Sequence, residues 1–263
     1  RADSMGKVSN PTAGLHDPYW YESSVGLVYI IDMLNPDIGI ETVTLQAEGL
    51  KGLDDIVVKY RGGNQKLVQV KHTRADDSIT FGDLLTIDED AKVRDDDKIE
   101  KMSLLTQLAN AWNEASQHSS DCTALLYTNR KAGQRPYTRS TQHKRPSLAT
   151  FWPDLKSKLQ KSSKLEEISF DTEYEAAWTE LLSHLDILVD ADKKFQFLSR
   201  FDIDYSQPTL EELGQKLLKK ISDAFGINTN QAQTVLADLD TSLRRWATTS
   251  RGKKQTVTIE DVY

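Results

Sequence analysis

The first apolar pattern along the chain repeats at helical spacing. Trp20, Val28, Ile31 and Leu34 fall on one side of a helix over residues 17–35. The segment begins with Asp-Pro, a favourable cap followed by a residue suited to the first helical turn, and it ends at Asn-Pro. The pattern therefore predicts a helix near the start of the chain.

The apolar runs that follow have the composition of strands. Residues 42–45, 56–60 and 66–72 are rich in Val, Ile, Leu and Thr, and the last two flank a Gly-Gly turn, which is a hairpin signal. Residues 123–128 form another strand-like run. Strands that lie between helices predict an α/β fold, with a mixed sheet flanked by helices.

The second half of the chain is mainly helical in pattern. A capping box from Thr209 to Glu212 opens one amphipathic helix, and Gly226 closes it. The remaining predictions are helices over residues 98–116, 173–185 and around 235–246, a strand over residues 195–205, a loop over residues 76–100 and a linker at residues 251–254.

The length of 263 residues suits one large domain with an appendage. We expect a tag remnant or disordered N-terminus over residues 1–13, an α/β domain over residues 14–207 and a helical extension over residues 208–263. The extension would lead toward a following domain, so we expect the chain to be one piece of a longer protein.

Composition and charge exclude several classes of protein. The 33 basic and 40 acidic residues give a net charge of −7, which argues against nucleic-acid binding through overall charge alone. The single cysteine excludes an intramolecular disulfide and fits a cytoplasmic location. The longest apolar run, Val25–Ile31, is far shorter than the roughly 20 residues that cross a bilayer, so we expect no membrane insertion.

One loop differs in charge from the acidic remainder of the chain. Residues 129–146 contain six basic side chains and no acidic ones. Such a cluster is a candidate for binding the DNA backbone, and the alternative is a solvated loop. The candidate DNA-binding residues are Arg130, Lys131, Arg135, Arg139, Lys144 and Arg145.

The candidate chemistry lies on the two strands of the predicted hairpin. Gln69 and Lys71 are two residues apart, so they share one strand face, and the valines beside them point to the other face. Asp55 precedes the opposite strand. Mg²⁺ prefers hard oxygen ligands, which Asp55, Gln69 and the residue 70 carbonyl can supply. Lys71 would orient an attacking water and counter charge on a phosphate.

The hairpin register decides which acidic residue faces Lys71. If residues 62–64 form a three-residue loop, Asp55 faces Lys71, whereas a two-residue or four-residue loop puts Asp54 there. We favour Asp55 because it directly precedes the apolar strand. The alternative for the whole group is an ordinary amphipathic hairpin with solvated polar ends.

These residues together resemble the PD-(D/E)XK nuclease superfamily, in its Mrr-like branch with Gln-x-Lys. The matching motifs are Asp54-Asp55-Ile-Val-Val, Val68-Gln-Val-Lys-His72, Tyr21-Glu22 in the first helix and the later strand that ends in Thr-Asn at residues 128–129. More closely, residues 14–130 look like the N-terminal nuclease domain of antiviral STAND ATPases and of SAVED-domain effectors of CBASS. The helical remainder looks like the segment that precedes the ATPase in STAND members.

The resemblance implies a restriction-endonuclease-like fold and Mg²⁺-dependent hydrolysis of phosphodiester bonds in double-stranded DNA, with Mn²⁺ as a substitute cofactor. It implies Asp55, Gln69 and Glu22 as metal-binding catalytic residues and Lys71 as the catalytic lysine. Either Glu41 or Glu48 would approach the metal as well. Because Gln69 brings one carboxylate fewer than the usual acidic ligand, we expect weaker metal affinity unless Glu22 compensates.

The resemblance also implies a role in prokaryotic antiphage defence. The nuclease would stay silent until a sensor or ATPase domain in the same full-length chain assembles it into a homo-oligomer. A second hypothesis is a catalytically degenerate nuclease-fold module that serves DNA binding or oligomerisation, and loss of metal dependence would distinguish it. A third is an RNA-directed nuclease, which competition between DNA and RNA substrates would test.

Overall fold

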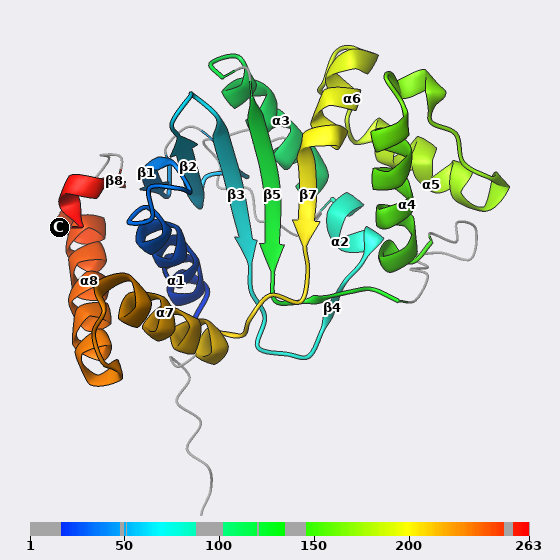
Figure 1. Cartoon of the computed structure of the whole chain (residues 1–263). Helices are drawn as coiled ribbons and strands as arrows, with labels where there is room; N and C mark the ends of the chain where they lie inside the picture. The colour runs from blue at the N-terminus through cyan, green and yellow to red at the C-terminus, as the bar shows by residue number, and fades with distance from the viewer. Residues whose placement is uncertain are drawn as a thin grey trace, which may run out of the picture.

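The centre of the structure is a six-stranded mixed β-sheet. The computed structural model describes residues 17–47, 50, 52–87, 102–119, 121–134, 146–249 and 255–262. The strands of the sheet are β1 (Ile40–Leu45), β2 (Ile56–Tyr60), β3 (Gln65–Lys71), β5 (Cys122–Thr128), β7 (Phe201–Asp204) and β8 (Gln255–Thr258). They lie in the order β7-β5-β3-β2-β1-β8. In Figure 1 the arrows of β3, β5 and β7 point the same way, and antiparallel pairing adds β2, β1 and β8.

Helices flank this sheet, which confirms the predicted α/β fold. The helices are α1 (Asp17–Asp32), α2 (Phe81–Leu85), α3 (Leu104–Ser116), α4 (Leu148–Lys161), α5 (Thr172–Ser183), α6 (Ala191–Arg200), α7 (Leu210–Phe225) and α8 (Thr229–Thr249). A small second sheet pairs β4 (Ser78–Ile79) with β6 (Lys131–Ala132), and 3₁₀ turns lie at Leu165–Glu167 and Ile259–Asp261. Of the described helices, none has both the length and the apolar character to span a membrane.

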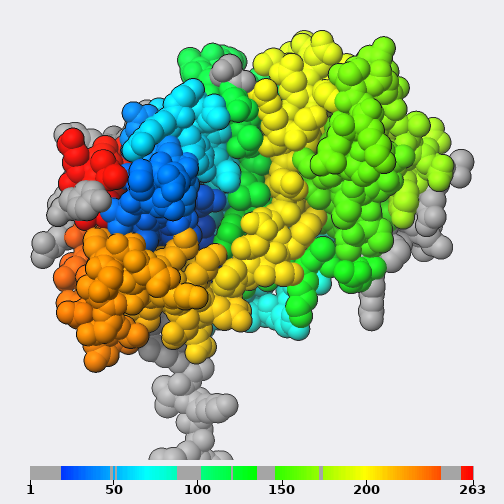
Figure 2. Space-filling model, in the orientation of Figure 1, coloured from blue at the N-terminus to red at the C-terminus, as the bar shows by residue number. Residues whose placement is uncertain are grey.

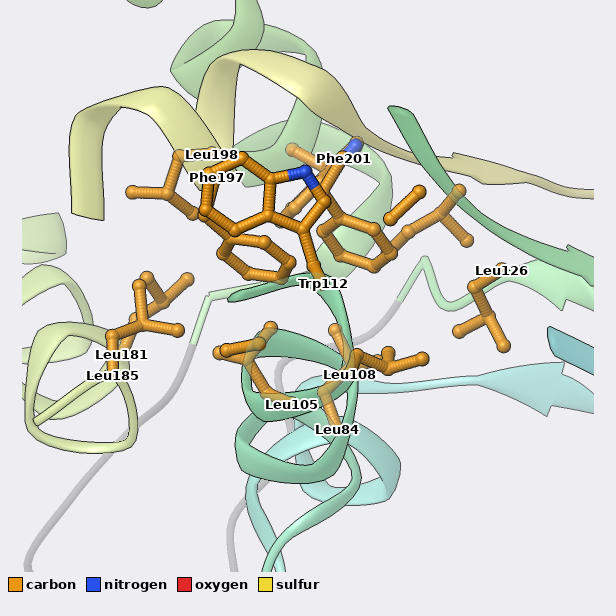
Figure 3. Close-up of a cluster of buried hydrophobic side chains, with 14 of the residues drawn as sticks. Leu84, Leu105, Leu108, Trp112, Leu126, Leu181, Leu185, Phe197, Leu198 and Phe201 are labelled. Atoms are coloured by element: carbon orange, nitrogen blue, oxygen red, sulfur yellow. The ribbon is translucent and has the colours of Figure 1, made fainter. Parts of the chain in front are cut away.

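Each face of the sheet has its own hydrophobic core. One core surrounds Trp112, where Figure 3 shows side chains of α3, α5, α6 and β7 meeting. Trp112 is fully buried, and its ring N–H donates to the Cys122 carbonyl at 2.8 Å. The other core lies between the sheet and helices α1, α7 and α8. Because both faces are buried, β2 and β5 contain short apolar runs, at residues 56–58 and 124–127.

The C-terminal elements share the second core. Leu213 and Leu217 of α7 and Val257 of β8 are buried together with residues of α1. Asp32 of α1 forms an ion pair with Lys220 of α7, 188 residues away in the sequence. Figure 2 shows the orange C-terminal helices lying against the blue N-terminal segment. Elements on both sides of the boundary predicted after residue 207 therefore contribute to one hydrophobic core.

The strand predicted over residues 195–205 is divided between a helix and a strand. Helix α6 continues to Arg200, and β7 begins at the next residue. Asp190 caps the helix, because its side chain accepts a hydrogen bond from the Lys193 N–H at 2.6 Å. The strand prediction is therefore wrong over residues 195–200, where the helix that begins after Asp190 continues to Arg200.

The loop predicted over residues 76–100 also contains regular structure. Its described part includes β4 and the short helix α2, which a capping box between Thr80 and Asp83 begins. Residues 88–101 lie outside the described part of the chain. The capping box predicted from Thr209 to Glu212 is confirmed at the start of α7.

The junction between α6 and β7 is held by Lys156 of α4. The Lys156 ammonium donates hydrogen bonds to the main-chain carbonyls of Leu198, Ser199 and Phe201, at 3.2, 3.2 and 2.7 Å. Burial lowers the pKa of Lys156, and the charge of Asp202 opposes that effect. A cation at this position satisfies carbonyl groups that the end of the helix leaves unpaired.

Replacing this lysine should destabilise the fold. We expect Lys156→Met to lower the free energy of unfolding by about 2 kcal/mol, because three carbonyls lose a charged donor. Urea denaturation would measure the change. Lys161→Met, at an exposed position of the same helix, is the matched control, and equal losses in both variants would contradict the role given to Lys156.

Candidate functional site

The hairpin register places the predicted site residues on one face of the sheet. A main-chain hydrogen bond of 2.9 Å closes the hairpin around a loop of residues 61–63. The two glycines in this loop have φ angles of 96° and 89°, a region that favours glycine. The loop lies one residue earlier than predicted, so Asp55 faces Gln69 and not Lys71. Because the pairing moves by two residues, all three side chains remain on the same face.

Asp55 is anchored to the end of β3 by two donors. Its Oδ2 accepts a hydrogen bond from the Val70 main-chain N–H at 2.7 Å, and the Gln69 side-chain amide donates to the same oxygen. Gln69 is only 6% exposed. The second carboxylate oxygen of Asp55 and the amide oxygen of Gln69 are therefore the atoms through which these two residues can hold a cation.

Glu22 of α1 meets Asp55 across a narrow pocket. Tyr19, Ser23 and Leu243 also line the pocket. Burial, and next the charge of Asp55, raise the pKa of Glu22 to about 7. Burial raises the pKa of Asp55 to about 6, although its hydrogen bond from the residue 70 N–H acts in the opposite direction. Two acidic side chains are thus held together where solvent screens them poorly.

Lys71 supplies the positive charge next to this acidic pair. It is the last residue of β3, and its side chain is exposed. The Lys71 charge lowers the pKa of both Glu22 and Asp55, although burial outweighs it in each case. The structure therefore brings Glu22, Asp55, Gln69 and Lys71 into one electrostatic group.

The neighbouring His72 packs against the other face of the strand. Its ring stacks on the Tyr21 ring at a centroid distance of 4.4 Å, and burial lowers the pKa of the imidazole. The Tyr21 hydroxyl donates to the Pro208 carbonyl at 2.8 Å. His72 thus helps to pack α1, the helix that carries Glu22, against the sheet.

The structure places Asp54, Asp55 and Glu41, three of the acids among which the sequence left a choice. The Asp54 side chain turns back into its own loop, where Oδ1 accepts the Gly52 N–H at 3.1 Å. Glu41, the second residue of β1, lies beside the hairpin end of β2, whereas Asp55 lies at the opposite end of that strand pair. Asp55 is therefore the acid that faces Gln69, and Glu41 is remote from it. Glu48 lies outside the described residues.

The donor set fits a hard divalent cation. Carboxylate and amide oxygens from Asp55, Gln69 and Glu22 are the ligands that Mg²⁺ prefers. A buried acid pair also needs a positive partner to remain charged. Within the described residues, no group of three or more His, Cys, Asp or Glu side chains forms a metal site, so the donor set depends on the amide of Gln69.

An open groove adjoins the site at the carboxyl ends of the parallel strands. It has a volume of about 820 Å³, and its walls include His72, Arg74, Asn129, Lys131 and Glu211. The Asn129 side chain accepts from the Thr73 N–H at 3.0 Å and donates to the Thr73 carbonyl at 2.7 Å. This pair of bonds sets the path of the chain directly after Lys71 and His72.

Of the six predicted DNA-binding residues, Arg130 and Lys131 lie in the described part of the chain, and both form ion pairs with acidic side chains. Arg130 forms ion pairs with Asp77 at 2.9 Å and with Asp83 at 3.2 Å, and it donates to the Ser78 carbonyl at 2.7 Å. Lys131 is exposed and forms an ion pair with Asp76 at 2.8 Å. Arg135, Arg139, Lys144 and Arg145 lie outside the described residues.

Gln46 is a site residue that the sequence analysis missed. It follows β1 and lines the pocket with Glu22 and Asp55, and its side-chain amide lowers the pKa of Glu22 against the larger effect of burial. Its φ angle is 50°, in the left-handed region that few residues other than glycine adopt. A Gln after an ordinary strand carries no sequence signal for this conformation.

The raised pKa values predict that the site loses stability as the pH rises. Between about pH 4 and pH 7 the folded protein holds protons on Glu22 and Asp55 that the unfolded chain has lost, so the free energy of unfolding falls through this window. We expect Glu22→Gln, in EDTA at pH 8, to gain on the order of 1 kcal/mol after allowance for solvent screening.

Thermal unfolding between pH 4.5 and pH 8 would measure the effect. The Glu22→Gln variant should show a higher Tm than the wild type at pH 8 and a smaller difference at pH 4.5. Glu41→Gln, an exposed acid at the far end of β1, serves as the control. A Glu22→Gln variant that is less stable than the wild type at pH 8 would contradict the electrostatic strain described above.

Comparison with known proteins found similar solved structures. No family model matches the sequence, and no curated protein matches it. The solved structures include the Acinetobacter baumannii Cap4 SAVED/CARF-domain containing receptor, at 11% identity and a TM-score of 0.46 over 93% of this chain and 45% of that chain. The same receptor with the cyclic trinucleotide 3'3'3'-cAAA matches at 12% identity and a TM-score of 0.47, over 93% and 43% of the two chains. This chain thus spans less than half the length of the receptor chains that it matches.

Proposed function

We propose that this chain is the nuclease domain of a prokaryotic antiphage effector. In this proposal it hydrolyses phosphodiester bonds of double-stranded DNA with a divalent cation, and assembly activates it. The observation that carries the proposal is the acid pair of Glu22 and Asp55, held in a pocket beside Gln69 and Lys71. The motif similarity to PD-(D/E)XK nucleases, in the order of the residues along the chain, supports the assignment.

The burial of these polar groups favours a nuclease site over an ordinary amphipathic hairpin. Solvated polar ends would leave Gln69 exposed, yet its side chain is buried and bonded to Asp55. Holding two acids together raises the free energy of the metal-free fold. Buried acid pairs of this kind are concentrated at catalytic and ligand-binding sites. The alternative explanation of the pair is a structural ion-pair network without a function.

In the proposed mechanism the side chains divide the work of binding and charge stabilisation. Asp55, Gln69 and Glu22 would hold Mg²⁺ through their oxygen atoms. When bound, the cation supplies Lewis-acid activation of the scissile phosphate. Lys71, at the exposed end of β3, would orient the attacking water and stabilise the negative charge that develops on the phosphate. Gln69 also fixes Asp55 by donating to its carboxylate.

The DNA backbone would approach along the groove at the carboxyl ends of β3, β5 and β7, next to Lys71. The groove has mixed charge, because Lys131 and Arg74 share it with acidic residues of α7. Additional positive charge would come from the basic residues between positions 135 and 145. Cutting both strands requires two sites on one DNA, and assembly into an oligomer would supply them together with more phosphate contacts.

Removing the lysine should abolish cutting without unfolding the protein. We expect Lys71→Ala to lower the rate of plasmid cleavage in Mg²⁺ by about 10²-fold or more, because a charge that stabilises the transition state is removed. The assay needs the longest chain available together with its trigger. Lys59→Ala, an exposed lysine on the neighbouring strand β2, is the matched control and should cut like the wild type.

The same assay separates the nuclease from a degenerate module. Metal-dependent cutting that survives Lys71→Ala would remove this residue from the mechanism. An assembled protein that binds DNA equally well in EDTA and in Mg²⁺, and cuts neither plasmid nor linear duplex, would support the non-catalytic module. Competition with double-stranded RNA would identify the substrate sugar.

The basic residues should affect DNA affinity and stability in different ways. We expect the quadruple change of Arg135, Arg139, Lys144 and Arg145 to Ala to weaken duplex binding and to reduce the salt slope by roughly 0.9 for each phosphate that the variant no longer neutralises. Its Tm should stay close to that of the wild type. Fluorescence anisotropy across a range of salt concentrations would measure the slope.

Arg130→Ala is the informative contrast in that experiment. Because the Arg130 guanidinium bonds to Asp77, Asp83 and the Ser78 carbonyl, its removal should lower the Tm. An unchanged salt slope in the quadruple variant would show that the loop does not contact the DNA backbone.

A further inference from the structure

The backbone at Gln46 breaks the regular alternation of its strand. Leu45 packs in the core beneath α1, whereas Ala47 packs in the core on the opposite face, around Trp112. In a regular strand, residues two apart share a face. Gln46 has a φ angle of 50° and is one of two residues other than glycine with a positive φ in the described part of the chain. The reversal of faces therefore occurs at Gln46.

Hydrogen bonds hold this distortion in place. The Gln46 N–H donates to the Asp55 carbonyl at 2.9 Å, and the Ala47 N–H donates to the Asp54 carbonyl at 2.7 Å. A regular antiparallel ladder uses alternate residues, so two consecutive N–H groups aimed at one partner strand mark an irregularity of the bulge type. Such irregularities next to active sites turn a side chain toward the site.

The turned side chain enters the pocket of the acid pair. Gln46 lines this pocket together with Glu22 and Asp55, and its side-chain amide acts on the Glu22 carboxylate to lower the pKa of that acid, against the larger effect of burial. Through its main chain it also bonds to Asp55. One residue thus lies in the pocket with both acids and is bonded to one of them, although Glu22 lies on a helix and Asp55 at the start of a strand.

We propose that Gln46 is a positioning residue for a divalent cation at this site. In this role, Gln46 holds the Glu22 carboxylate in place relative to Asp55. This inference rests on the proposed function. Helix α1 and the β2–β3 hairpin are separate elements, so the placement of Glu22 requires a link between them. The left-handed backbone at Gln46 supplies that link, and strained conformations of this kind are concentrated at functional sites.

The test compares metal affinity with stability in glycine variants. Glycine adopts the left-handed conformation freely, so Gln46→Gly removes the side chain and keeps the backbone. We expect Mn²⁺ affinity, measured by the EPR signal of free Mn²⁺, to fall about tenfold while the Tm stays equal or rises. Ser206→Gly is the matched control, because Ser206 has a φ angle of 53°. It should keep wild-type affinity.

Two further variants separate the possible failures. Asp55→Asn should abolish Mn²⁺ binding, and Gln46→Asn tolerates the left-handed backbone but shortens the amide by one methylene, so its affinity should also fall. Wild-type affinity in both Gln46 variants, with no binding by Asp55→Asn, would overturn the positioning role and leave the proposed nuclease site intact. Absence of Mn²⁺ binding by the wild type would overturn the metal site and this role with it.

Discussion

The bond between the Asp55 carboxylate and the Val70 N–H is the contact on which the candidate site depends. It joins the start of β2 to the end of β3 at 2.7 Å, where the hairpin would otherwise have two separate ends. Burying a carboxylate costs free energy, and main-chain and side-chain donors offset part of that cost. With Asp55 fixed in this way, Gln69 becomes its direct partner and Lys71 emerges beside it, so a single cross-strand contact orders three polar residues.

The site nevertheless retains electrostatic strain. The pKa of Glu22 lies near 7 and that of Asp55 near 6, because burial, and at Glu22 also the charge of Asp55, outweigh the hydrogen bonds and the Lys71 charge. A fold selected for stability alone would replace one acid by an amide or an apolar side chain. In the proposed function, a bound cation would offset this cost of the acid pair.

Side chains on alternate residues of a strand share a face, and this regularity explains how much of the site could be predicted. Asp55, Gln69 and Lys71 share a face in any register shifted by two residues, so an error of one residue in the loop left the grouping intact. Gln46 could not be predicted, because its contribution comes from a left-handed backbone that only the packed strands impose. Arg130 looked like a phosphate ligand in the sequence, and its acidic partners Asp77 and Asp83 became visible only when the chain was folded.

The placement of Glu22 also depends on residues far along the chain. Helix α1 is held by the Tyr21 hydroxyl on the Pro208 carbonyl and by the ion pair of Asp32 with Lys220. Leu243 of α8 lines the same pocket as Glu22, and β8 pairs with β1 directly before Gln46. A displacement of α7, α8 or β8 would therefore reach the acid pair by two routes, through α1 and through the end of β1. In the proposed effector, these C-terminal elements would be the path by which assembly changes the geometry of the site.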